Sequence, residues 1–236
     1  MEGNGKVAEP LCAIGLRVGG VDHGFAAAGE PVPPEYRVAR VRQVHGTAIV
    51  WAGDVAPAPD VEADAIVTDA PGVAVAVATA DCVPLLLVAP GAGVVAAVHA
   101  GWRGTLSDIA GVVVRELHAR RGIGADELRV ALGPSIDGCC FEIEREIAER
   151  FADRHGAEIW RAWRDGPASD GIARGTLDLR AVNRWLLLAA GVLDHAIEFV
   201  GPCTFCGGGP FASFRRDGAN AGRQLSWIAR TTRSPE

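Results

Sequence analysis

The sequence predicts an α/β or α+β domain in which mixed β-sheets are flanked by helices. Short, valine-rich apolar runs fill the middle of the chain, and longer segments with helical periodicity follow them. Strands and helices do not alternate strictly, which favours a domain with mixed sheets. No linker divides the 236 residues, so we expect residues 1–236 to form a single domain.

Strands are expected where an apolar run is bounded by glycine, proline or a polar residue. Runs this short and this rich in valine are typical of buried strands rather than helices. Upstream, Tyr36–Val44 alternates polar and apolar residues, and Thr47–Trp51 continues this half-buried pattern. Residues 1–34 are loosely specified, apart from a candidate opening strand at Leu11–Val18. The other expected strands are Ala65–Val67, Val73–Ala78, Val83–Val88, Val94–Val98, Leu128–Leu132, Ile197–Val200 and Gln224–Ile228.

Three helices are expected from Thr105 onward. The first, Thr105–Arg121, begins at a capping residue and is followed by Gly122, a common stop signal. The second, Glu142–Arg154, is charged and carries apolar residues at four-residue spacing on one face. The third is Leu177–Ala190, and we expect Ala162–Gly175 before it to be a loop.

Composition excludes several classes of protein. A formal net charge of −6 argues against a nucleic-acid-binding surface, which needs a basic footprint. Met1–Pro10 is polar and does not resemble a signal peptide. The most apolar region, Gly72–Ala100, is interrupted by Asp81, Pro84 and Pro90, so no membrane-spanning segment is expected. Six cysteines are too few for a disulfide scaffold. We therefore expect a soluble cytoplasmic protein whose cysteines are thiols, metal ligands or nucleophiles.

The strongest candidates for chemistry are His45, Cys82 and His99. Cys82 directly precedes the expected strand Val83–Val88, and His99, seventeen positions later, directly follows Val94–Val98. If these strands pair, both side chains reach one rim of the sheet, where His45 must arrive from an earlier segment. Two imidazoles and one thiolate suit a catalytic zinc site with an open position. The same residues also suit a cysteine nucleophile with a histidine base, and both interpretations remain open.

Charged residues beside this trio extend the candidate site. Asp81 stands at the head of a buried strand, where a carboxylate is costly unless it is paired. Arg103 lies in the turn Gly101–Gly104 before an expected helix, where free backbone N–H groups and a guanidinium would attract phosphate or carboxylate. The alternative is an ordinary turn with a solvated arginine. Arg215 is a further candidate for phosphate or ribose, because its planar fork suits such groups.

The remaining cysteines permit a second metal site. Cys203 and Cys206 form a C-x-x-C motif, and one hypothesis adds Cys139 and Cys140 to it in a four-sulfur zinc site. Such sites usually draw on two spaced pairs, and adjacent cysteines do not easily point at one metal. We therefore expect these four residues to be core thiols near the pocket.

Several segments in order resemble the laccase-domain, YfiH-like family. They extend over roughly residues 36–228, and the string from His99 to Thr105 with the upstream Asp81-Cys82 is highly specific. The matching segments are Gln43-Val44-His45-Gly46, Asp64-Ala65-Ile66-Val67-Thr68, Ala80-Asp81-Cys82-Val83-Pro84, His99-Ala100-Gly101-Trp102-Arg103-Gly104-Thr105, Leu132-Gly133-Pro134-Ser135-Ile136, Cys139-Cys140-Phe141-Glu142-Ile143, Cys203-Thr204, Phe214-Arg215-Arg216-Asp217-Gly218 and Gly222-Arg223.

The resemblance implies a fold, a metal and an activity. The fold is expected to resemble the cytotoxic necrotizing factor catalytic domain, a layered structure of mixed β-sheets with flanking helices. Two histidines and one cysteine bind zinc in similar proteins, which implies zinc at His45, Cys82 and His99. Some members are similar to purine nucleoside phosphorylases that also deaminate adenosine. Others are described as copper-dependent polyphenol oxidases or peptidoglycan editing factors.

The resulting hypothesis is a zinc-dependent enzyme that acts on a purine nucleoside, a transferase when phosphate is the acceptor and a hydrolase when adenosine is deaminated. In deamination, zinc activates water and Asp81 shuttles a proton or orients a ligand. In phosphorolysis, Arg103 and Arg215 hold phosphate. A second hypothesis places copper at the site, although six histidines in all argue against a multicopper cluster. A third is a hydrolase with Cys82 as nucleophile and His99 as base, and a fourth is a module that only binds metal.

Overall fold

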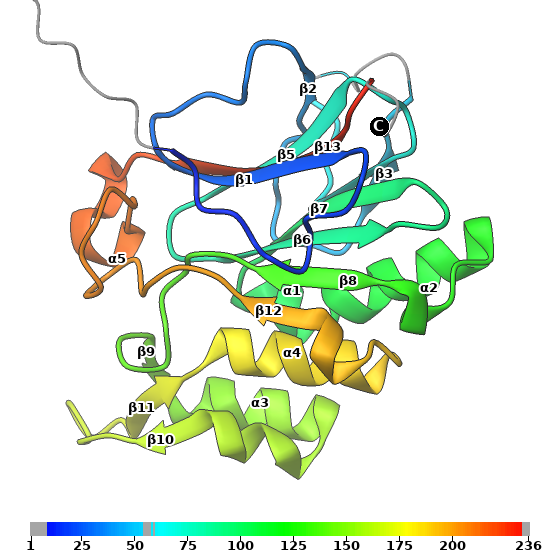
Figure 1. The fold of residues 1–236 in the computed structure, drawn as a ribbon. Coiled ribbons are helices and arrows are strands. Elements are labelled where there is room, and N and C mark those ends of the chain that lie inside the picture. The colour runs from blue at the N-terminus through cyan, green and yellow to red at the C-terminus, as the bar shows by residue number, and fades with distance from the viewer. Residues whose placement is uncertain (1–8, 54–57, 59, 233–236) are drawn as a thin grey trace, which may run out of the picture.

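The computed structural model describes residues 9–53, 58 and 60–232, which form stacked layers (Figure 1). The strands are β1 Val21–Ala28, β2 Arg37–Ala39, β3 Ile49–Trp51, β4 Ala65–Thr68, β5 Val73–Thr79, β6 Val83–Ala89, β7 Val94–Ala100, β8 Arg129–Leu132, β9 Glu142–Glu144, β10 Trp163–Asp165, β11 Arg174–Leu177, β12 Ile197–Phe199 and β13 Gln224–Arg230. The helices are α1 Trp102–Leu106, α2 Ile109–Arg121, α3 Arg145–His155, α4 Leu179–Ala189 and α5 Phe214–Asp217.

Two mixed sheets lie face to face, and helices cover the outer face of the larger one. The first sheet has the order β1-β13-β5-β2, and the second has the order β12-β8-β6-β7-β4-β3. Helices α2 and α4 pack on the side of the second sheet that faces away from the first (Figure 1). A small sheet, β10-β11-β9, lies with α3 at the far end of the molecule from β1. The expected class, mixed sheets with flanking helices, is confirmed.

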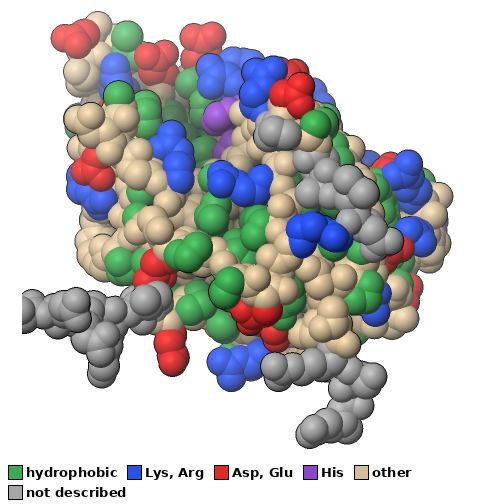
Figure 2. Space-filling view, turned by 90° about the horizontal axis from the view of Figure 1, so that it is seen from above, with side chains coloured by type: hydrophobic (Ala, Val, Ile, Leu, Met, Phe, Trp, Pro, Cys, Tyr) green, Lys and Arg blue, Asp and Glu red, His purple; other side chains and the backbone are tan. Residues whose placement is uncertain are grey.

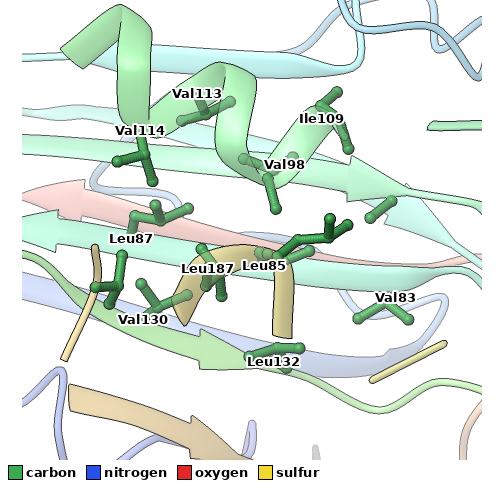
Figure 3. Packing of buried hydrophobic residues seen from close by; sticks show 14 of the residues in the cluster. Val83, Leu85, Leu87, Val98, Ile109, Val113, Val114, Val130, Leu132 and Leu187 are labelled. Atoms are coloured by element: carbon green, nitrogen blue, oxygen red, sulfur yellow. The ribbon is translucent and has the colours of Figure 1, made fainter. Parts of the chain in front are cut away.

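The central strand β6 is buried on both faces, so each of its side chains joins one of two cores. Leu85 and Leu87 belong to the core beneath the helices, whereas Leu86 and Val88 belong to the core between the two sheets. This division follows from the two-residue period of a strand. Figure 3 shows the first core, in which Leu85 and Leu87 share a layer with helix residues Ile109, Val113, Val114 and Leu187. Burial on both faces explains why β6 is a continuous apolar run.

The loosely specified N-terminal segment contains a strand that the sequence does not indicate. β1 pairs antiparallel with β13, so that Val21 lies opposite Arg230 near the other end of the chain. The strand expected at Leu11–Val18 does not form, and of it only Leu11 makes a bridge, to Phe25. Long-range pairing, rather than local pattern, therefore decides which part of this segment becomes a strand.

Two of the expected helices begin differently, and one expected loop is partly ordered. The helix expected at Thr105–Arg121 is divided into α1 and α2, because Asp108 adopts a left-handed conformation and caps α2. The helix expected at Glu142–Arg154 begins only at Arg145, since its first residues form β9 and pair with β11. The loop expected at Ala162–Gly175 contains β10 and the start of β11. Within the described part of the chain, no helix has the length and apolarity needed to cross a membrane.

Candidate active site

The predicted trio converges at one edge of the six-stranded sheet. β6 and β7 are antiparallel neighbours, with Val83 opposite Ala100 and Pro84 opposite His99. Cys82, directly before β6, and His99, near the end of β7, therefore reach the same edge, as the strand-pairing prediction requires. His45 arrives in the loop between β2 and β3. Its side chain is exposed, whereas that of His99 is buried.

The three donor groups are spaced as a single metal ion requires. One ligand atom from each of His45, Cys82 and His99 lies within 4.8 Å of the others. The two imidazole rings are nearly perpendicular, with an interplanar angle of 82° and centroids 4.8 Å apart. A Cβ atom at Gly101 would lie 2.8 Å from His45 Cδ2 and 3.1 Å from Cys82 Sγ. Glycine at this position therefore keeps open the space beside the donors, and the set fits zinc with one position left for water or substrate.

Asp64 orients two of the three donors, a role that the sequence analysis missed. Its buried carboxylate accepts a hydrogen bond from His99 Nδ1 at 2.8 Å. It also accepts from the backbone N–H groups of His45 at 2.9 Å and Gly46 at 2.6 Å. These bonds support His45 in a left-handed conformation with φ of 61° and leave Nε2 as the ring nitrogen of His99 that can bind a metal. Like Asp81, Asp64 is a charged residue at the head of an expected buried strand, and this pattern indicates a paired carboxylate there.

Mutual hydrogen bonding shifts the pKa values of the buried groups. Burial by itself raises the pKa of Cys82, but hydrogen bonds with His45 and His99 outweigh it and lower the pKa to about 7. Burial by itself lowers the pKa of His99, but hydrogen bonds with Asp64 and Cys82 raise it to about 9. The pKa of Asp64 is lowered, since hydrogen bonds from His99 and Gly46 overcome the opposing effect of burial. The site thus favours a thiolate at Cys82, which is the form that binds metal.

Asp81 joins this edge of the sheet to two later segments. Thr204 Oγ1 donates to Asp81 Oδ1 at 2.6 Å, and the backbone N–H of Arg215 donates to Oδ2 at 2.6 Å. The backbone N–H of Ile136 donates to the Asp81 carbonyl at 2.9 Å. The buried charge is therefore paired, as its position in the sequence required. Asp81 lines the cavity next to Cys82.

The donors open into a cavity of about 710 Å³. This volume lies within the range of roughly 300–1,000 Å³ found for small-molecule sites. The predicted arginines Arg103 and Arg215 both line the cavity, as do Arg40 and Arg223. Figure 2 shows histidine in a hollow of the surface with basic side chains close to it. The cavity therefore combines a metal-donor set with positive charge.

The cavity walls hold the arginines in place and offer one unpartnered hydroxyl. The guanidinium of Arg103 lies 4.3 Å from the ring centroid of Trp102. The Arg215 side chain donates to the carbonyl of Glu142 at 3.0 Å. Thr79 Oγ1 is buried and has no hydrogen-bond partner among the described residues, although Thr79 lines the cavity. A buried hydroxyl without a partner is costly, and a bound ligand would supply the missing hydrogen bond.

Comparison with known proteins identifies the family. Residues 25–231 match the family described as "Multi-copper polyphenol oxidoreductase laccase". The chain belongs to this laccase-domain family. It is 40% identical over 167 residues to "Purine nucleoside phosphorylase YlmD" of Geobacillus stearothermophilus, a match that covers 71% of this chain and 60% of the relative. It is 43% identical over 167 residues to "Adenosine deaminase RL5" of an unknown prokaryotic organism, with 71% and 62% covered. The matches therefore span about three fifths of these two relatives.

Solved structures of the laccase-domain family share the fold. The crystal structure of YlmD from Geobacillus stearothermophilus superposes with a TM-score of 0.81 at 30% identity, covering 95% of this chain and 97% of that one. The crystal structure of the Bacillus licheniformis hypothetical protein YfiH has a TM-score of 0.80 at 26% identity, with 89% and 93% covered. The layered arrangement implied by the family resemblance is thus confirmed.

Proposed function

We propose that this laccase-domain protein is a zinc-dependent purine nucleoside phosphorylase that also deaminates adenosine. The observation that carries the proposal is the clustering of His45, Cys82 and His99 within 4.8 Å at the wall of an arginine-lined cavity. The names of the relatives, purine nucleoside phosphorylase and adenosine deaminase, supply the substrate class.

The chemistry of the donor set favours zinc over copper. One thiolate and two imidazoles leave one position open, which is the usual composition of a catalytic zinc site. Although the family description names multicopper oxidoreductases, a cluster of several coppers needs more imidazoles than this site holds. Among the described residues, the only group of candidate metal ligands that contains histidine is this trio. When bound, zinc supplies Lewis-acid chemistry that makes water nucleophilic at neutral pH.

In deamination, water replaces the amino group at C6 of adenine and ammonia leaves, so adenosine becomes inosine. Asp64 holds His99 in one tautomer and fixes the loop of His45, which keeps the donors preorganised. Each carboxylate oxygen of Asp81 accepts one hydrogen bond, Oδ1 from the hydroxyl of Thr204 and Oδ2 from the backbone N–H of Arg215. This pairing favours an orienting role for Asp81 over that of a proton shuttle. The hydroxyl of Thr79 is suited to a hydrogen bond with the substrate.

In phosphorolysis, a phosphate oxygen attacks C1′ of the ribose, the bond to the base breaks, and ribose 1-phosphate and free base are formed. Arg103 and Arg215 are the residues proposed to bind the phosphate, and their presence in the cavity lining supports this role. Stacking on Trp102 limits the freedom of Arg103, which lowers the entropy lost on binding. The arginines thereby position the phosphate nucleophile for attack on C1′.

A second candidate rests on the low pKa of the same thiol. Cys82 has a pKa of about 7 and hydrogen bonds with His45 and His99, which would also suit a cysteine nucleophile with a histidine base. The two candidates differ in their dependence on metal. A nucleophile is blocked by a tightly bound ion, whereas a ligand needs that ion for activity.

The proposal is tested with purified, zinc-loaded protein incubated with adenosine or inosine, with and without phosphate. Free base that forms only with phosphate supports phosphorolysis, and ammonia released from adenosine without phosphate supports deamination. Chelation should abolish deamination, and zinc should restore it. Failure of the zinc-loaded protein to convert any purine nucleoside would overturn the proposal. Activity that rises when zinc is removed would instead favour the cysteine nucleophile.

A further inference from the structure

We infer that Cys139, Cys140, Cys203 and Cys206 form a structural zinc site, separate from the histidine-containing trio. The four Sγ atoms all lie within 4.8 Å of one another. They come from two turns, one before β9 and the other between β12 and α5. Soft thiolate ligands favour zinc among the common divalent ions.

The sulfur spacing matches one tetrahedral ion. With Zn–S bonds of about 2.3 Å, the sulfurs of a tetrahedral site lie about 3.8 Å apart. Cys139 Sγ lies 3.4 Å from Cys140 Sγ and 3.5 Å from Cys206 Sγ. A disulfide would require about 2.05 Å. The sulfurs are therefore spaced as ligands of a single ion rather than as bonded pairs.

Local turns explain how the adjacent cysteines reach the same point. The backbone N–H groups of Cys140 and Phe141 both donate to the carbonyl of Asp137 at 2.9 Å, which forms a tight turn. In the second turn, the N–H of Gly207 donates to the carbonyl of Cys203 at 2.9 Å. The expectation that adjacent cysteines do not easily point at one metal is therefore wrong for this geometry, because the sulfurs of Cys139 and Cys140 both belong to the cluster. The expectation of core thiols is also wrong for Cys139 and Cys206, which are exposed.

Backbone contacts support the most buried of the four sulfurs. The N–H of Asp137 lies 3.4 Å from Cys203 Sγ, to which it donates. The N–H of Thr204 donates to the carbonyl of Ser135 at 2.9 Å, which ties the two turns together. N–H donors directed at a ligand sulfur stabilise its thiolate form. The protein thus provides the outer contacts that a zinc-bound thiolate needs.

The position of the cluster indicates a structural role. Four thiolates leave no position on zinc for water or substrate, which is typical of structural sites. Both turns also contact Asp81, one through Ile136 and the other through Thr204. Ile136 and Phe141 line the cavity. A zinc ion at the cysteine cluster would therefore hold together the two turns that support the cavity wall, without taking part in the nucleoside reaction.

The zinc content of the purified protein tests the assignment. The full chain is first saturated with zinc and then freed of loosely bound metal by gel filtration. We expect two zinc ions per wild-type chain and one per C203S/C206S chain. Cys82→Ala should also retain one, and the matched control Cys12→Ser should retain two, because Cys12 lies outside both clusters. A C203S/C206S variant that keeps the wild-type zinc content would overturn the inference.

Alkylation of the wild-type protein provides a test that does not depend on any variant folding. In reducing buffer, iodoacetamide should modify Cys139, Cys140 and Cys206 at least about tenfold more slowly with zinc than after chelation. Cys12 should react at the same rate in both states, which excludes general unfolding. Equal rates with and without zinc at the exposed Cys139 and Cys206, or a disulfide between them under these conditions, would contradict a zinc site. Neither measurement depends on nucleoside turnover, so this inference and the proposed function fail separately.

Discussion

The two donor clusters of the molecule differ in the kind of structure that holds them. The histidine-containing trio stands at the edge of a buried sheet, where a fully buried carboxylate orients two of its members and a cavity adjoins the donors. The cysteine cluster stands in two surface turns and is supported by backbone N–H groups. Three donors beside a cavity leave a metal free to react, whereas four donors enclose it. The fold therefore holds a donor set suited to catalysis apart from a donor set suited to a structural ion.

Removing a donor from the trio should have the largest effect on catalysis. Cys82→Ala is expected to lower nucleoside turnover by about 10³-fold or more, because a direct ligand should matter more than the 10–100-fold effect of its outer partners. Zinc content should fall by one ion per chain and no further. Turnover by HPLC and zinc by mass spectrometry check this. Loss of all zinc from this variant would show that the two clusters are not independent.

Removing the orienting carboxylate should have the next largest effect. Asp64→Asn keeps the size of the side chain but loses the charge that pairs with His99, so zinc affinity or activity should fall about 10–100-fold. Competition with a chromogenic chelator measures the affinity. Asp69→Asn is the matched control, since Asp69 is a half-buried carboxylate outside the site that contacts Arg121. Equal zinc affinity in the Asp64 and Asp69 variants would contradict the positioning role.

Removing a cavity arginine should affect one reaction only. Arg103→Ala is expected to raise the KM for phosphate about tenfold, because the variant loses roughly one charge-assisted hydrogen bond to the phosphate. Deamination and zinc content should stay near wild-type values, because Arg103 is not a donor to the metal. Initial rates over a range of phosphate concentrations give the KM. Arg154→Ala on the surface of α3 serves as the control, and an equal change in both variants would refute a specific phosphate contact.

Removing donors from the cysteine cluster should have the smallest effect on turnover and a clear effect on stability. C203S/C206S is expected to change turnover only a few-fold while removing the stabilisation by zinc at the cysteine cluster, which amounts to about 2.7 kcal/mol at a hundredfold excess over Kd. This energy corresponds to a Tm lower by roughly 5–10 °C. Calorimetry with and without zinc measures the difference. A thousandfold loss of turnover with an unchanged Tm would reverse the roles given to the two clusters.

Local sequence patterns predict much of the fold and one of the two donor clusters, the histidine-containing trio. The valine-rich runs that form β4 to β7 are recognisable because each is buried on both faces and needs no partner from elsewhere to explain its composition. Cys82 and His99 could be paired from sequence because they flank two neighbouring strands joined by a short turn. β1 was missed, since its partner β13 lies about two hundred residues away.

The sequence by itself determined the mixed α/β class, the family and the trio of His45, Cys82 and His99, because these follow from short-range patterns and one specific string. Only the tertiary structure decided the role of Asp64, whose carboxylate meets His45 and His99 after separate segments come together. It also decided the cysteine cluster, whose two turns are joined by Ser135 and Thr204 across a long stretch of chain. Contacts between distant segments depend on loop closure and on strand pairing, and the local periodicity of a sequence predicts neither.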